Sequence, residues 1–177
     1  RLQLERLRTD WWIRGDRLDR SFEPARDPAP IRLPLRRVYG ASAPALAHRS
    51  SGLVFLAVAF MLRQYARHGR LSPPAASIVG YGILRLTVLR SPRGIERYRR
   101  AGLEWIERAP GSVFNVHAKH LIRAWIDPWL APRRSVIDPL AEVAEELRET
   151  GQLGHSSSCL HVRACYLALV GEPLSVE

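Results

Sequence analysis

Two histidines in the second half of the chain are spaced so that they could bind one metal ion. His117 and His120 lie three residues apart in a segment expected to be helical, which places both imidazoles on one helix face. A usable site needs a third ligand, and Asp127 is two turns away. The alternative is a partly buried pair of histidines that form hydrogen bonds inside a helical protein. We adopt this alternative, so no metal site is predicted.

A second, looser cluster combines His155 and His161 with the two cysteines, Cys159 and Cys165. The cysteines are six residues apart and should point to different faces of a helix. Neither thiol has a visible activating feature, such as a helix N-terminus with flanking arginine. We therefore predict structural roles for these residues and no metal or redox use.

The sequence lacks the motifs of common active sites. There is no phosphate-binding loop of the form G-x-x-x-x-G-K-[ST], because Lys119 is the only lysine and the residues before it lack glycines at that spacing. There is also no G-x-G-x-x-G, H-R-D, D-F-G or G-x-S-x-G motif. We therefore predict no catalytic residue and no cofactor, and we expect that this segment is not an enzyme.

The charge is strongly basic and unevenly distributed. The 177 residues carry a net charge of +10, with 27 basic and 17 acidic side chains. Residues 135–177 hold only 2 of the basic and 7 of the acidic side chains. Arg97, Arg99 and Arg100 form a basic patch that neighbouring glutamates partly neutralise, and we interpret it as a solvated face, with a partner contact as the alternative. The charge also allows a nucleic-acid-binding regulator, but no groove-reading motif accompanies it.

Apolar periodicity, caps and turn residues predict an all-α chain. Residues 1–37 form an Arg- and Pro-rich connector with a possible short helix, and residues 38–177 form a helical-repeat domain. Its expected helices are 45–68, 75–89, 93–108, 113–126, a fifth between Ser135 and Gly151, and 156–170. They pair as three antiparallel hairpins, over about 43–90, 92–128 and 134–171, in a TPR-like or armadillo-like α-solenoid.

Several residues are assigned to particular positions in these helices. Ser135 is the expected N-cap of the fifth helix, and Gly151 and Gly171 are expected to end the last two helices. In the last helix Leu160, Ala164, Leu167 and Ala168 should face inward, and in the fourth helix so should either Ala124 or Trp125. The small residues of the second helix, including Gly80 and Gly82, should permit close helix packing.

The longest apolar run, over 53–62, is about half the ~20 residues that a membrane helix needs. We therefore expect no membrane segment and a cytoplasmic location. The chain begins with Arg1 and has no initiator Met, so we expect it to be a piece of a longer protein.

The second half of the chain resembles a known family. It contains RGIERYRRAGLEWIER and then HAKHLIRAWIDPWLAPRRSVIDPLAEVAEELRETGQLGHSSSCLHVRACYLALVGEPL. This ordered series is similar to the helical-repeat region of large bacterial multidomain signalling ATPases. Those proteins combine a serine/threonine-kinase-like domain, an AAA-type ATPase domain and, in many cases, a sensor and histidine kinase. Gln152 departs from the aspartate that usually follows the helix-ending glycine.

The resemblance implies a non-catalytic scaffold or regulatory segment, with the catalytic domains elsewhere in the parent protein. Its partners would be other domains of that protein or a separate protein. No catalytic residue of the family can be transferred, because none of its catalytic motifs is present. A small helical enzyme that uses His117, His120 or Cys159 is a further, less favoured alternative.

Overall fold

The computed structural model describes residue 7 and residues 53–54, 56–60, 62, 75–87, 90, 92–108, 110 and 113–171. These residues are mostly helical and include no strand, which confirms the all-α prediction for this part of the chain. The 1–37 connector, apart from residue 7, and much of the expected helix over 45–68 lie outside the described residues. None of the described helices combines the length and the apolar character needed to cross a membrane.

The chain divides into two compact units. One comprises Arg1–Pro73 and Leu84–Ser91, and the other comprises Pro74–Ile83 and Pro92–Glu177. The second, which we call the C-terminal unit, holds all the candidate sites described below. Helix α5, Ala75–Thr87, begins in the C-terminal unit and ends in the other.

Helix α6, Ile95–Arg108, is amphipathic. Its buried residues recur with helical spacing and form one stripe: Ile95, Tyr98, Ala101, Gly102 and Trp105. Gly94, directly before the helix, has a φ of +75°, a conformation that favours glycine. This agrees with the expected helix start at this point.

Two glycines bring α5 and α6 close together. A Cβ added to Gly102 would lie 2.4 Å from Cγ2 of Val79, and one added to Gly82 would lie 2.8 Å from the Cβ of Tyr98. The expectation of close packing is thus confirmed at Gly82. Gly80 plays no such part, because nothing lies within 4 Å of a Cβ built there.

Helix α7, Val113–Leu121, continues into a π-helical segment, η1, Ile122–Ile126, and a 3-10 turn, η2, Asp127–Trp129. The expected helix over 113–126 therefore has the right extent, but its last five residues are π-helical. The wider turn of a π-helix shifts the inward face. Ala124 is consequently buried, whereas Trp125 is 45% exposed.

A short 3-10 turn, η3, Arg133–Val136, precedes α8, Ile137–Glu149, and α9 spans Leu153–Val170. The predicted Ser135 cap is wrong. The Ser135 hydroxyl donates to the carbonyl oxygen of Pro132 at 2.7 Å, and α8 begins after the 3-10 turn without a side-chain cap. The stops at Gly151 and Gly171 are confirmed, with φ of +73° and +77°.

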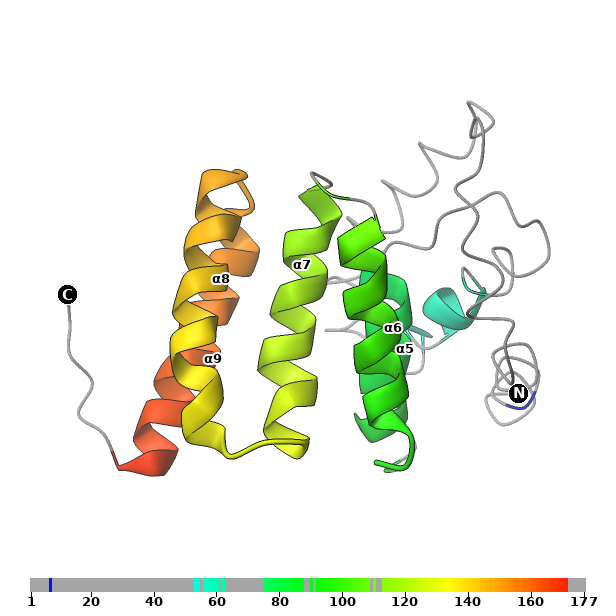
Figure 1. Ribbon diagram of the computed structural model, residues 1–177, viewed down its shortest axis with the longest axis horizontal. Coiled ribbons are helices and arrows are strands. Elements are labelled where there is room, and N and C mark those ends of the chain that lie inside the picture. Colours follow the sequence, from blue (N-terminus) through cyan, green and yellow to red (C-terminus); the bar gives the residue numbers. More distant parts are fainter. Residues whose placement is uncertain are drawn as a thin grey trace. The chain divides into compact units, whose positions relative to one another are not determined.

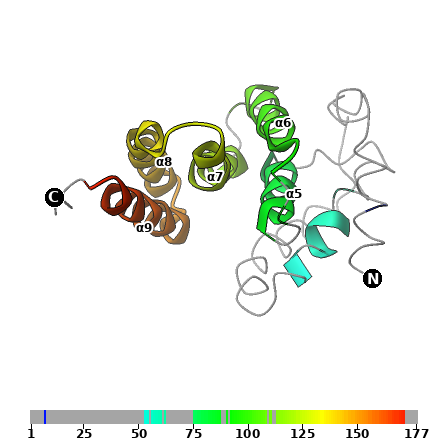
Figure 2. The same ribbon diagram turned by 90° about the horizontal axis from the view of Figure 1, so that it is seen from below.

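Helices α8 and α9 form a hairpin with its own core. Figure 1 shows α6, α7 and α8 side by side, and Figure 2 shows α9 packed against α8. The core is built from small and medium-sized apolar side chains: Ala124, Leu140, Val143, Ala144, Leu147 and Cys159. We call the continuous stretch of α7, η1 and η2 the α7 segment. Because Ala124 belongs to η1, this core also joins the hairpin to the α7 segment.

The inward face of α9 differs in part from the prediction. Leu167 is buried as expected, but Leu160 is 49% exposed and Ala168 is also exposed, while Ser156 and Cys159 are buried. The Ser156 hydroxyl donates to the carbonyl oxygen of Ala144 at 2.8 Å, and the Cys159 thiol donates to that of Leu140 at 3.3 Å. Small polar side chains thus satisfy backbone acceptors of α8 on the face where apolar residues were expected.

Candidate functional site

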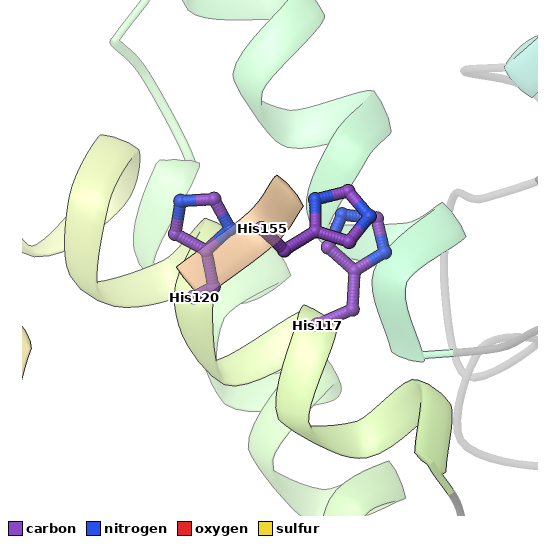
Figure 3. A group of neighbouring side chains, drawn as sticks. All are labelled: His117, His120 and His155. Carbon is purple, nitrogen blue, oxygen red and sulfur yellow. The ribbon is translucent and has the colours of Figure 1, made fainter. Parts of the chain in front are cut away.

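Three histidines from two helices meet inside the C-terminal unit. His117 and His120 lie on α7, and His155 lies in the first turn of α9. Figure 3 shows their rings gathered between the two helices. The rings of His117 and His155 are stacked, with centroids 4.0 Å apart and planes inclined by 22°. We call these three residues the histidine triad.

The ring centroid of His120 lies 6.0 Å from that of His155 and 6.2 Å from that of His117. His120 is only 3% exposed, and neither of its ring nitrogens has a hydrogen-bond partner among the described residues. A buried polar group without a partner costs about 1–3 kcal/mol. The interpretation of His117 and His120 as a hydrogen-bonded pair therefore does not hold for His120 in the described part of the chain.

The surroundings of the triad favour neutral imidazoles. Burial, and then the charges of His155 and His120, lower the pKa of His117 to about 3. Burial, followed by His155, lowers the pKa of His120 to about 4, and burial also lowers the pKa of His155. All three rings are therefore neutral at pH 7, so each retains an unprotonated nitrogen with a free lone pair.

Among the described residues, the triad is also a group of potential metal ligands in close reach of one another. One nitrogen of each ring lies within 4.8 Å of the chosen nitrogens of the other two. In a tetrahedral zinc site with Zn–N bonds of about 2.0–2.1 Å, ligand nitrogens are about 3.3 Å apart. To bind such an ion, the rings must rotate so that the distances between the ligand nitrogens shorten by up to about 1.5 Å. The rotation must also point the lone pairs of the stacked His117 and His155 rings at one position.

The other ligand considered with the His117/His120 pair, Asp127, is engaged elsewhere. Its carboxylate accepts hydrogen bonds from Arg99 and Arg123.

The members of the second, looser cluster of histidines and cysteines are separated in the structure. His155 joins the triad, and Cys159 bonds to a backbone carbonyl oxygen, with burial raising its pKa to about 11.

The remaining pair of that cluster lies at the surface. His161 Nε2 and Cys165 Sγ are 3.8 Å apart on the exposed side of α9. The expectation that the two cysteines point to different faces is confirmed, since Cys159 is buried and Cys165 is exposed.

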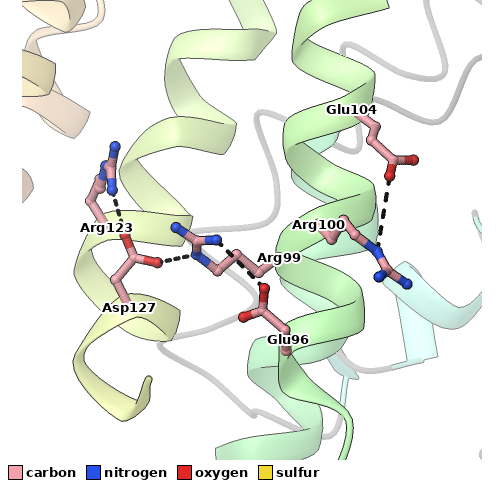
Figure 4. A network of polar contacts seen from close by, with 6 residues as sticks. All are labelled: Glu96, Arg99, Arg100, Glu104, Arg123 and Asp127. Carbon is pink, nitrogen blue, oxygen red and sulfur yellow. Dashed lines mark hydrogen bonds and ion pairs between the residues drawn. The ribbon is translucent and has the colours of Figure 1, made fainter. Parts of the chain in front are cut away.

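The three arginines for which a partner contact was the alternative interpretation have different environments. Arg99 donates from Nε to Oδ1 of the buried Asp127 at 2.6 Å, and this hydrogen bond is the main cause that raises the pKa of Arg99. Arg123 Nη1 donates to the other carboxylate oxygen at 2.8 Å. Figure 4 shows that this network joins α6 to the end of the α7 segment. Arg99 is therefore engaged within the unit.

Arg100 is directed to the surface instead. Its side chain is 70% exposed, and its Nε lies 3.9 Å from Oε1 of Glu104 on the same helix (Figure 4). Arg97 is partly buried on α6. Of the three, Arg100 is the one whose exposure best suits a contact with a partner.

The exposed side of α9 carries no formal charge from Asp, Glu, Lys or Arg. The only such residue among its 18 residues is Arg163, which is partly buried. We call the exposed residues the outer face of α9: Leu153, Gly154, Ser157, Ser158, Leu160, His161, Cys165, Ala168 and Leu169. By contrast, α8 exposes charged residues along its length. Leu153 and Leu160 are seven residues apart and lie on one side of this face, whereas Leu169 lies on the opposite side of the helix. This face was missed because α9 shows no clear apolar stripe.

Comparisons with protein-family models, curated proteins and solved structures find no match for this chain.

Proposed function

We propose that this chain is a non-catalytic helical-repeat segment of a larger, cytoplasmic bacterial signal-transduction ATPase or kinase, where it mediates contacts between domains. The outer face of α9 is the observation that carries this proposal. In a stack of helix hairpins, each hairpin buries one face on its predecessor and the opposite face on its successor, so an inner hairpin is apolar on both sides. In the α8/α9 hairpin, the exposed side of α9 is free of Asp, Glu, Lys and Arg, and we assign the contact with the next hairpin to it.

The proposed occupant of this face is a helical hairpin of the same parent protein. Leu153 and Leu160 are each more than a third exposed and lie on one side of α9, with no exposed charged residue of α9 between them. Covering them with another apolar helix would remove apolar area from water without desolvating a formal charge. A strongly acidic or basic ligand would find no counter-charge on this helix face.

The order of elements supports the same proposal. The helix α6 is followed by α7, and α8 is followed by α9, with short connections as in stacked helix hairpins. The resemblance of the second half to the repeat region of signalling ATPases adds the parent context, with the kinase-like and AAA-type domains outside this segment.

The first test is the sequence of the reading frame on both sides of the segment. The proposal expects kinase-like and AAA-type domains in the same frame and further helical repeats next to this segment. A frame that contains neither catalytic domain would refute the proposed parent. ATP hydrolysis by the purified chain itself would refute the non-catalytic role.

The second test concerns the surface. The adjoining repeats of the parent, added in trans, should bind the chain, and Leu160→Glu should weaken that binding by at least tenfold because it places a charge in an apolar contact. The matched control is Glu142→Arg, a charge change on the exposed side of α8, which should leave the affinity unchanged. Equal affinities for the two variants would show that the outer face of α9 is not the contact.

A further inference from the structure

The histidine triad has a property that the proposed function does not use. Its members come from two helices that are separate in the sequence, and the most buried member, His120, has no hydrogen-bond partner for either ring nitrogen among the described residues. A buried imidazole is normally stabilised by a hydrogen bond or by a metal ion. The geometry therefore suggests a ligand inside the triad.

We propose that His117, His120 and His155 bind a divalent transition metal ion of the Zn²⁺ class and thereby join α7 to the beginning of α9. Two ligands at positions i and i+3 of one helix and a third from a second helix are a compact way to build such a site. The site stands apart from the proposed function, since it lies between α7 and α9 and not on the outer face of α9.

The donor set selects the kind of metal. Three imidazoles suit Zn²⁺, Co²⁺, Ni²⁺ or Cu²⁺, whereas Mg²⁺ and Ca²⁺ require oxygen ligands. No carboxylate or thiolate belongs to this group. Three protein ligands leave the fourth position of a tetrahedral ion for water or another small ligand.

The electrostatics of the triad support binding. Deprotonated imidazole is the form that binds metal, and all three pKa values are lowered, so binding at pH 7 does not have to displace protons. The arrangement without metal is not yet tetrahedral, because the rings of His117 and His155 are stacked. Rotation of the partly buried His155 ring would break the stack and bring its lone pair toward His120.

A structural consequence follows from the positions of the ligands. His155 lies in the first turn of α9, and the same turn presents Ser156 to α8. An ion held by α7 and α9 would therefore tie the α8/α9 hairpin to the preceding helix. It would stabilise the folded state by mass action, since the unfolded chain does not hold the three ligands together.

The experiment is a Zn²⁺ titration of the complete, tag-free chain after treatment with a chelator, followed by calorimetry and by competition with a chromophoric chelator. We expect one ion per chain, with Mg²⁺ without effect. At free Zn²⁺ about 100 times the Kd, the Tm should rise by about 5 °C or more.

The variants are His155→Gln and His120→Gln. Loss of an outer-shell partner of a metal ligand lowers affinity by about 10–100-fold, so loss of a ligand should cost at least as much. If His120→Gln does not fold, as judged by its far-UV circular dichroism, His155→Gln alone decides the question, because His155 is less buried. The Zn–N distance from X-ray absorption should be about 2.0–2.1 Å with imidazole scattering.

The matched control is the double variant His161→Gln, Cys165→Ser, which removes the other His-containing pair of α9 from its exposed side. This control should bind Zn²⁺ like the original chain. The inference is overturned if the original chain shows no stoichiometric binding at micromolar concentrations. It is also overturned if a folded His155→Gln variant binds as tightly as the original, or if the His161/Cys165 control abolishes binding.

Discussion

Replacing Arg99 should destabilise the C-terminal unit far more than replacing its neighbour Arg100. The two residues are adjacent on α6 but differ in their partners. Arg99 donates at 2.6 Å to a carboxylate of Asp127 that is only 4% exposed, whereas Arg100 lies 3.9 Å from the partly exposed Glu104. Arg99→Met and Arg100→Met both keep most of the aliphatic part of the side chain and remove the guanidinium, with its charge and its hydrogen-bond donors.

The expected magnitudes follow from burial. Breaking a buried ion pair costs about 3–5 kcal/mol because a charge is left unpaired. Here Asp127 retains Arg123 at 2.8 Å, and the Arg99 side chain is 28% exposed, so we expect about 2 kcal/mol for Arg99→Met. An exposed i,i+4 pair contributes about 0.3–0.5 kcal/mol, which sets the expectation for Arg100→Met.

The assay is urea unfolding followed by circular dichroism, together with hydrogen exchange of α6 and η1 to localise the effect to the C-terminal unit. With an m value of about 2 kcal/mol per M urea, the midpoint should fall by about 1 M for Arg99→Met and by about 0.2 M for Arg100→Met. A double-mutant cycle with Asp127→Asn should give a coupling energy above about 1 kcal/mol.

Raising the salt concentration should change the effect of Arg99→Met little, because the carboxylate of Asp127 is buried away from the counterions. Equal midpoints for the two single variants, or a coupling energy near zero, would refute the view that this network holds α6 against the end of the α7 segment.

Three further outcomes are expected. In chelator-treated protein, the lowered pKa values of the triad mean that the unfolded chain takes up more protons than the folded chain below about pH 6.5. Stability should therefore fall from pH 6.5 toward pH 4. Between pH 7 and pH 5 the free energy of unfolding should fall by on the order of 2 kcal/mol for each of the two α7 histidines. In a variant with all three histidines of the triad changed to glutamine, the urea midpoint should depend much less on pH. Gly102→Ala should lower the stability measured by thermal unfolding by about 1–3 kcal/mol, because the added Cβ would clash with Val79. Gly80→Ala should instead stabilise α5 by about 0.5–1 kcal/mol, because nothing lies near the added Cβ. The reverse order of stabilities would contradict the described packing. A thiol reagent should modify the exposed Cys165 in the folded protein and the buried Cys159 only after unfolding, and mass spectrometry of the labelled peptides would expose any error in this assignment.

Local sequence patterns were enough for the helices themselves and for several of their ends. The stripe of α6 and the stops at Gly151 and Gly171 depend on interactions within a few residues, namely apolar spacing and a glycine with positive φ. The cap at Ser135 failed for an equally local reason, because its hydroxyl bonds backward to Pro132 in a 3-10 turn.

The sequence did not predict which face of α9 or of the α7 segment points inward. In α9, apolar and small polar residues occur all round, so sequence alone could not show that Ser156 and Cys159 face α8 while Leu160 faces outward. In the α7 segment, one π-helical turn rotates the inward face and exposes Trp125. An α-helical turn and a π-helical turn do not differ clearly in local sequence preference, so packing decides which of the two forms.

The sequence by itself determined the helical character of the described part of the chain, the positions of most described helices and the possibility that His117 and His120 share one helix face. Only the tertiary structure placed His155 beside them and turned Asp127 toward Arg99. The physical reason is that helix formation depends on neighbours along the chain, whereas a site built from two helices depends on how their faces pack. The spacing of residues within one helix carries no information about which residue of another helix will lie against it.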